Sequence, residues 1–261
     1  MNRIENTTKK LSHNNEKALI GYFMAGEFSN EQTLKIMHEG VASGLDIIEL
    51  GFPFSDPTAD GGTIQISAQK SLKNGTKLED VFTLVEEFRK NDSQTPIILM
   101  GYFNIIFQYG EAEFLKKCSQ IGVDGIICVD LPIEESLSFE TIANELNICV
   151  IQIVSFLTNK ERFLQIQARA RGFIYLVSTL GVTGQTLPMV ERIGNYIQEN
   201  KPTLPIFVGF GVSSPEIAAS VSKHANGVIV GSYFIESARK DETLSTLKSE
   251  ISKIKTAINL S

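Results

Sequence analysis

Short apolar runs alternate with longer amphipathic segments along almost the whole chain. The short runs are rich in Ile, Val and Leu and contain very few polar residues, as expected of parallel strands that are buried on both faces. They predict strands at 18–24, 46–50, 96–100, 125–129, 149–154, 173–177, 206–208 and 228–230.

The segments between these runs carry apolar residues three and four positions apart, the spacing of a helix with one buried face. In one of them Val81, Leu84, Val85 and Phe88 fall on the same side. The segments predict helices at 32–42, 78–89, 112–121, 136–146, 160–169, 187–199, 215–222 and 244–258.

Eight strand-and-helix units follow one another without a linker or low-complexity break. Such alternation predicts a parallel sheet with right-handed crossovers, and eight units in a chain of this length favour a closed (β/α)8 barrel, a TIM barrel, over an open sheet. We expect residues 1–261 to form one α/β domain, with a short helix before the first strand packed across the bottom of the barrel. In this fold the active site lies at the C-terminal ends of the strands.

A glutamate stands where the second strand should contribute an apolar residue. Glu49 is either part of a structural ion pair or a carboxyl at the barrel mouth whose pKa is raised by burial. The loop after it is rich in proline and glycine and carries Asp56 and Asp60. Each aspartate, taken alone, is as compatible with capping a turn or helix as with catalysis. Together with Glu49, this stiff loop suits acid/base chemistry by two carboxyls.

Glycine-rich turns follow the sixth, seventh and eighth predicted strands. Backbone N–H groups can approach an anion closely at such turns, and phosphate binding after the last strands recurs in barrels. The turns contain Gly184, Gly211, Gly231 and Ser232. Apolar and aromatic residues near strand ends could complete a pocket for a flat ring; they are Tyr22, Met100, Tyr102, Ile127, Tyr175 and Phe210.

Composition narrows the function classes. The net charge of −6, without a cluster of Lys or Arg, argues against a nucleic-acid surface. The apolar runs are too short to span a bilayer, and the polar N-terminus lacks the pattern of a secretory signal, so we expect a cytoplasmic protein. Cys118, Cys128 and Cys149 are too widely spaced for a disulfide framework or a metal site, and we expect no metal.

The region at the end of the second predicted strand carries a distinctive motif, ELGFPFSDP at 49–57, followed by ADG at 59–61 and TIQ at 63–65. Further motifs occur in order along the chain: YFMAG at 22–26, DLP at 130–132 with EE at 134–135, GVTG at 181–184, GFG at 209–211 and GS at 231–232. Together they resemble the tryptophan synthase alpha subunit family. The resemblance extends from about residue 18 to residue 235.

This resemblance implies the retro-aldol cleavage of indole-3-glycerol phosphate into indole and glyceraldehyde 3-phosphate, with no cofactor on this subunit. It assigns Glu49 as the general acid/base and Asp60 as the acceptor for the indole N–H. It places the phosphate at Gly184, Gly211, Gly231 and Ser232. The residues implied around the substrate are Tyr22, Ile64, Met100, Tyr102, Ile127, Tyr175, Thr183 and Phe210.

The resemblance also implies a partner, the pyridoxal-phosphate beta subunit of an α2β2 tetramer. The contact residues that it implies are Pro53, Asp56, Pro57 and Asn104. Three alternatives stay open: an isomerase built on another phosphate-binding barrel, a stand-alone indole-glycerol phosphate lyase, and a catalytically weak subunit that mainly activates its partner. The last alternative rests on the segment after Gly184, which is shorter than is common in the family.

Overall fold

A computed structural model describes residues 2–177, 186–209 and 211–260, and all strands within these ranges belong to one sheet. Every predicted apolar run forms a strand. The strands are β1 (Ala18–Met24), β2 (Ile47–Gly51), β3 (Ile97–Gly101), β4 (Gly125–Cys128), β5 (Cys149–Val150), β6 (Gln152–Ser155), β7 (Ile174–Val177), β8 (Ile206–Gly209) and β9 (Gly227–Val230).

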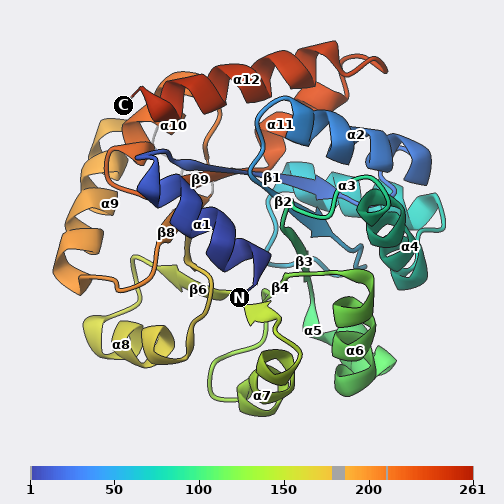
Figure 1. Cartoon of the computed structure of the whole chain (residues 1–261), viewed down its shortest axis with the longest axis horizontal. Helices are drawn as coiled ribbons and strands as arrows, with labels where there is room; N and C mark the ends of the chain where they lie inside the picture. The colour runs from blue at the N-terminus through green and yellow to red at the C-terminus, as the bar shows by residue number, and fades with distance from the viewer. Residues whose placement is uncertain (1, 178–185, 210, 261) are drawn as a thin grey trace.

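The strands pair in parallel in the order β5-β4-β3-β2-β1-β9-β8-β7-β6. The two ends of this order, β5 and β6, are separated in the chain only by Ile151, whose N–H still donates to the Ile126 carbonyl at 2.9 Å. They are therefore successive halves of one barrel strand, predicted as 149–154, and the nine segments occupy eight barrel positions. The predicted TIM barrel is confirmed (Figure 1).

Helices surround the sheet. Each predicted helix is present, and three others were not predicted as elements: α3, α5 and α11. The helices are α1 (Arg3–His13), α2 (Asn30–Ala42), α3 (Gly62–Lys73), α4 (Leu78–Arg89), α5 (Phe103–Tyr109), α6 (Glu111–Ile121), α7 (Leu137–Glu145), α8 (Lys160–Arg169), α9 (Thr186–Asn200), α10 (Pro215–Ser222), α11 (Ser232–Ala238) and α12 (Ser245–Asn259).

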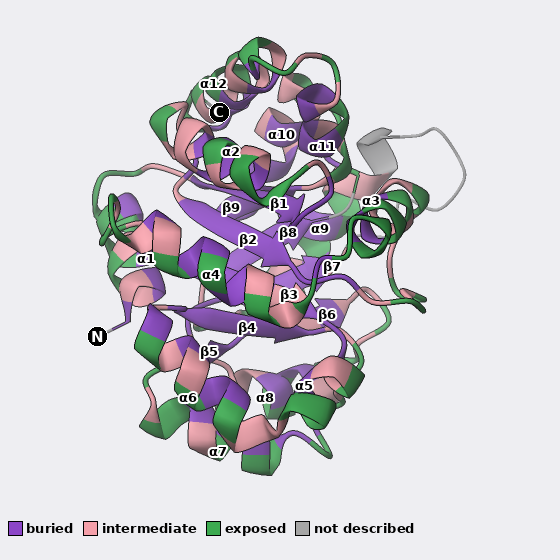
Figure 2. Ribbon diagram, turned by 90° about the vertical axis from the view of Figure 1, so that its right-hand side faces the viewer, coloured by how far each residue is buried: buried purple, intermediate pink, exposed green. Residues whose placement is uncertain are grey.

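The core has two layers. Alternate residues of a strand point to opposite faces, so Ile47 packs inside the barrel, whereas Ile48 and Leu50 pack between the barrel and its helices. Figure 2 shows the strands buried at the centre and the outer sides of the helices exposed. Because both faces of each described strand are covered, we expect a ligand to bind at an end of the barrel.

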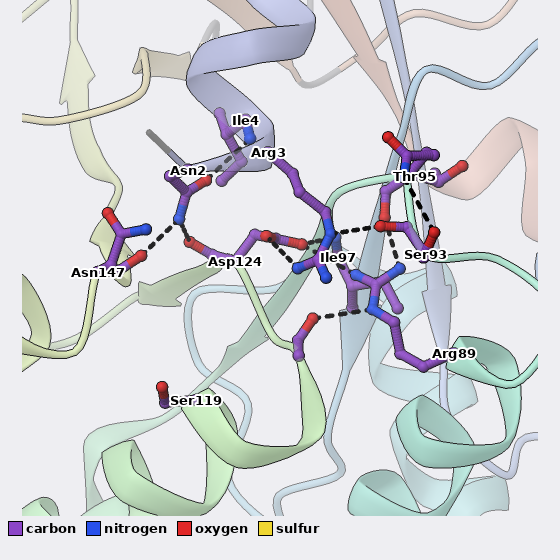
Figure 3. Close-up of polar contacts among 12 residues, drawn as sticks. Asn2, Arg3, Ile4, Arg89, Ser93, Thr95, Ile97, Ser119, Asp124 and Asn147 are labelled. Atoms are coloured by element: carbon purple, nitrogen blue, oxygen red, sulfur yellow. Dashed lines mark hydrogen bonds and ion pairs between the residues drawn. The ribbon is translucent and has the colours of Figure 1, made fainter.

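The N-terminal helix closes one of those ends. Ile4 and Leu11 of α1 join the cluster inside the barrel, and Ile4 lies against Gly125 and Gly172, which stand at or just before the starts of β4 and β7. The predicted short helix across the bottom of the barrel is thus confirmed (Figure 1). Hydrogen bonds from Asn2 to the carbonyls of Asp124 and Asn147, both 2.7 Å long, fix its first turn (Figure 3).

Candidate active site

A cavity of about 730 Å³ opens at the C-terminal ends of the strands, opposite α1. Nine of the predicted site residues line it: Tyr22, Glu49, Asp60, Ile64, Met100, Tyr175, Gly211, Gly231 and Ser232. Barrel topology brings together residues that lie more than 200 positions apart in the chain. Thr183, Gly184 and Phe210, also predicted, lie outside the described residues.

Glu49 points into this cavity from β2. It shares the inner face of the strand with Ile47, pairs in register with Tyr22 of β1 and Ile98 of β3, and is only 1% exposed. Neither carboxyl oxygen of Glu49 has a hydrogen-bond partner among the described residues. The structural ion pair considered from the sequence is therefore not formed there, and a buried carboxyl is left facing the cavity.

Asp60 is held by a tyrosine from the neighbouring part of the barrel. The Tyr102 hydroxyl donates to Asp60 Oδ2 at 3.1 Å and accepts from the Ala59 N–H at 2.9 Å. The alternative role of Asp60 as a helix cap is wrong, because α3 begins at Gly62 with Gly61 as its N-cap and has no side-chain cap. Its carboxylate is instead oriented towards the cavity wall by Tyr102.

The two carboxyls titrate in different ranges. Burial, and to a lesser degree the charge of Asp60, raise the pKa of Glu49 from 4.5 to about 8. Burial raises the pKa of Asp60 from 3.8 to about 6, against the lowering effect of the hydrogen bond from Tyr102. At neutral pH, Glu49 therefore holds a proton and Asp60 is mainly ionised. This is the pairing that a proton donor and a charge stabiliser require.

Two tyrosine rings flank the carboxyls. Burial, followed by the charges of Asp60 and Glu49, raises the pKa of Tyr22 and of Tyr175 well above 10, so both phenols are neutral. A Cβ at Gly51 would lie 2.3 Å from the Tyr22 hydroxyl, and one at Gly209 would lie 2.2 Å from that of Tyr175. Glycine at these strand ends therefore leaves the space that the two phenol rings occupy.

The opposite side of the cavity suits an anion bound by backbone groups. Gly211 has a φ of +83°, the left-handed region that glycine adopts without steric cost, and Ser232 begins α11. The described lining residues include no Lys or Arg, so a phosphate on this side would depend on N–H groups. Glu236 of α11 also lines the cavity and is paired with Arg239 at 2.5 Å.

Two of the predicted wall residues occupy other positions. Ile127 is fully buried in the barrel interior and does not line the cavity; Val129, two residues further along the same face, does so instead. Tyr102 contacts Asp60 behind the wall rather than lining it. Sequence reasoning missed several lining residues, which are Thr63, Val129, Ile153, Ser155, Val177, Val212, Ser213, Ile229, Tyr233 and Glu236. Continuing each strand's inward alternation to its last residue would have found Val129, Ile153, Ser155 and Val177.

The predicted partner-contact residues lie around the mouth of the barrel. Asp56 and Asn104 are exposed, Pro57 is half-buried and Pro53 is buried. Asp56 accepts a hydrogen bond from Ser55 Oγ at 2.5 Å. Nearby on α5, Phe107 exposes 65% of its surface. The role of these residues as partner contacts stays a prediction.

The described residues contain no group of three or more His, Cys, Asp or Glu side chains arranged to hold a metal ion. Cys118, Cys128 and Cys149 are buried and form no disulfide. Among the helices of the described ranges, none combines the length and the apolar character needed to cross a membrane.

Comparison with known proteins identifies the family. The sequence model of the tryptophan synthase alpha chain family matches residues 8–259. The tryptophan synthase alpha chain of Legionella pneumophila subsp. pneumophila is 43% identical over 237 residues, 90% of this chain and 87% of the relative. That of Marinobacter nauticus is 39% identical over 245 residues, 93% of this chain and 91% of the relative.

Solved structures agree with the sequence relatives. The crystal structure of tryptophan synthase subunit alpha from Legionella pneumophila str. Paris has a TM-score of 0.92 and 38% identity, and the match covers 100% of both chains. A structure of the tryptophan synthase α2β2 complex from Pyrococcus furiosus contains a chain with a TM-score of 0.84 and 37% identity, covering 92% of this chain and 98% of that one. This chain therefore belongs to the tryptophan synthase alpha chain family.

Proposed function

We propose that Glu49 and Asp60 carry out in this chain the reaction of its family, the cleavage of indole-3-glycerol phosphate to indole and glyceraldehyde 3-phosphate. The observation that supports these roles best is a buried carboxyl without a hydrogen-bond partner among the described residues, on a cavity that a second carboxyl also lines. Such a group costs several kcal/mol of folding free energy if ionised, and sites of this kind are typically functional.

Glu49 acts first as an acid and then as a base. With its pKa near 8 it holds a proton at neutral pH and delivers it to C3 of the indole ring. The carboxylate so formed takes the proton from the hydroxyl on the adjacent side-chain carbon. As that C–O bond becomes a carbonyl, the C–C bond to the ring breaks, and its electron pair restores the aromatic indole. Glu49 ends protonated, as it began.

Asp60 stabilises the intermediate between these two steps. Protonation at C3 leaves a positive charge that is shared with the ring nitrogen, and an ionised Asp60 accepts the N–H and offsets this charge. Its pKa of about 6 keeps it mainly ionised at neutral pH. Tyr102 orients the carboxylate, since its hydroxyl also bonds the backbone of Ala59 on the same loop.

The remainder of the cavity holds the other parts of the substrate. The indole lies between Tyr22, Met100 and Tyr175, with Ile64 nearby, and the phosphate lies at Gly211, Gly231 and Ser232. The family resemblance further assigns Gly184 to the phosphate and Thr183 and Phe210 to the indole; these three residues lie outside the described ranges. A volume of about 730 Å³ is ample for a substrate of this size.

The chain acts as the alpha subunit of tryptophan synthase in L-tryptophan biosynthesis. It needs no cofactor of its own, because pyridoxal phosphate belongs to the beta subunit, with which it forms an α2β2 tetramer like the one that the Pyrococcus furiosus structure is named for. We further propose that the surface around Asp56, Pro57 and Asn104, with Pro53 beneath it, meets that partner, that the whole chain is one domain, and that it works in the cytoplasm.

Measuring indole release from indole-3-glycerol phosphate, by the chain alone and with a beta subunit added, tests the proposal. We expect release by the wild-type chain and faster release with the partner. The absence of indole in both conditions would refute the proposed function. Release that the partner leaves unchanged would favour a stand-alone lyase and refute the assembly.

A further inference from the structure

An arginine distant from the reacting groups joins two walls of the cavity. Arg239, at the end of α11, donates from Nε to Glu27 Oε1 at 2.7 Å and from Nη2 to Ser67 Oγ of α3 at 3.0 Å. Its Nη1 pairs with Glu236 of α11 at 2.5 Å. Its side chain is 16% exposed, and that of Glu27 only 1%, so this ion pair is shielded from solvent.

Glu27 is itself fixed in place. It follows Gly26, whose φ of +68° turns the chain after β1, and the Asn74 side-chain amide donates to the carbonyls of Gly26, Glu27 and Phe28. Ser71 Oγ of α3 donates to the Ala25 carbonyl at 2.5 Å. The loop after β1 and α3 therefore form one rigid support, and Arg239 ties α11 to it.

The two helices joined by Arg239 begin at the cavity. The first residues of α3, which directly follow the Asp60 loop, line one side, and Gly231 with Ser232 at the start of α11 lines another. Figure 2 shows α3 and α11 as neighbours beside the barrel. Their relative placement sets the distance from Asp60 to the phosphate cradle, and a substrate held at both ends depends on this distance.

We propose that Arg239 is a positioning residue that sets the phosphate cradle at the correct distance from Asp60. It also pairs with Glu236, the carboxylate that lines the phosphate side, and so reduces that group's repulsion of the anion. This inference rests on the proposed function. A planar guanidinium can serve Glu27, Ser67 and Glu236 at once, whereas a lysine ammonium is a point charge and cannot span the three in this geometry.

The inference is tested with R239K and two substrates, indole-3-glycerol phosphate and its dephosphorylated form, indoleglycerol. With the phosphorylated substrate we expect a fall in kcat/KM of about 10-fold, since displacements of ~1 Å from a distant change can cost up to 100-fold. With indoleglycerol we expect a change of less than about 2-fold, because no group then binds the cradle. R171K, which alters an arginine bonded to Glu5 and Asn144 at the barrel bottom, is the matched control.

A loss of equal size with both substrates, or no loss with either, would overturn the inference. If R239K does not fold, S67A replaces it, since this change removes the bond from Arg239 to the α3 hydroxyl and otherwise only the bond from that hydroxyl to the Thr63 carbonyl of the same helix. The affinities of a non-cleavable indole alkyl phosphate and of the matching alcohol, compared in wild type and variant, test the positioning independently of turnover. A wild-type chain that releases no indole refutes the proposed function, while these affinities still decide the role of Arg239.

Discussion

Two buried carboxyls at opposite ends of the barrel have contrasting surroundings. Asp124 stands just before β4 at the bottom of the barrel and is 2% exposed; Glu49 stands near the top end of β2 and is 1% exposed. Asp124 accepts hydrogen bonds from Arg3 Nη1, Arg89 Nη2 and the Ile97 N–H, each 2.9 Å long (Figure 3). Glu49 accepts none from the described residues.

This difference in hydrogen bonding is what we expect between a structural carboxyl, Asp124, and a carboxyl with a proposed functional role, Glu49. Burial raises the pKa of Asp124, and the Ile97 N–H and the two arginines act against that rise. At Glu49 no hydrogen bond acts against burial, and the charge of Asp60 adds to it. The fold thus compensates the carboxyl that ties α1 and α4 to the barrel, and leaves uncompensated the one to which we assign proton transfer.

Replacing Glu49 tests the functional half of this comparison and should give the largest effect. E49Q keeps the shape but cannot transfer a proton, so we expect turnover to fall by about 10³-fold or more while substrate still binds. Indole release and substrate titration measure the two effects. E87Q, the same change at a half-buried glutamate on the surface of α4, is the control. Near-normal turnover by E49Q would contradict the assigned role.

E49Q should also be more stable than wild type at alkaline pH. The folded-state pKa of about 8 lies above the ordinary 4.5, so the folded chain holds the extra proton between these values. The contribution of Glu49 to stability is therefore full below pH 4.5 and is lost as the pH rises through 8, a change on the order of 5 kcal/mol. Denaturant unfolding of both proteins near pH 6 and pH 9 measures the part of this change that falls between those values, on the order of 3 kcal/mol, and a difference independent of pH would contradict it.

Replacing Asp124 tests the structural half. D124N leaves Arg3 and Arg89 without their shared carboxylate in a buried site, and we expect a loss of about 3–5 kcal/mol in unfolding free energy. The folded fraction of D124N should retain the wild-type kcat, because Asp124 lies at the opposite end of the barrel from the cavity. A fall in kcat comparable to that of D60N, measured well below the unfolding temperature, would show that the two ends are coupled.

Replacing Asp60 distinguishes its role from that of Glu49, the other carboxyl at the cavity. D60N removes the charge that stabilises the protonated ring, so turnover should fall by about 100- to 1000-fold. Because that charge also raises the pKa of Glu49, the alkaline limb of kcat/KM should move from about pH 8 to lower pH. A profile of kcat/KM against pH measures the shift. An unchanged alkaline limb would mean that the two groups do not interact.

Sequence patterns predicted the fold well because strand burial is local information. Apolar runs located every barrel strand, but α5 and α11 have only seven residues each, too few for helical spacing to be recognised. Both carboxyls were recognised because they interrupt a pattern or lie on a stiff loop. The sequence did not decide whether Asp60 caps a helix: in the fold Gly61 is the N-cap of α3, and Asp60 is bonded by Tyr102, which lies 42 residues further along the chain.

The sequence patterns did not predict how far along the barrel a residue lies, or which residues distant in the chain contact one another. Ile127 and Val129 share a strand face, and only the position of the strand end decides which of them reaches the cavity. Arg239 has Glu236 three residues before it, a spacing that in sequence indicates an ordinary surface pair. Its partners Glu27 and Ser67 lie 212 and 172 residues away, and these contacts, which suggest its function, follow from barrel closure alone.

Removing the Tyr102 hydroxyl should give the smallest effect on turnover. It tests how much a single hydrogen bond contributes to a buried carboxyl. Asp124 accepts hydrogen bonds from three donors, whereas the Tyr102 hydroxyl gives Asp60 one. Y102F removes that bond. The pKa of Asp60 should rise above about 6, since this bond lowers it, and the acid limb of kcat/KM should move to higher pH with it. Turnover should fall about 10-fold, the value of roughly one hydrogen bond to a charged group. Y109F, a change at an exposed phenol of α5, is the control. An acid limb that stays in place in Y102F would mean that Asp60 is oriented by its loop alone.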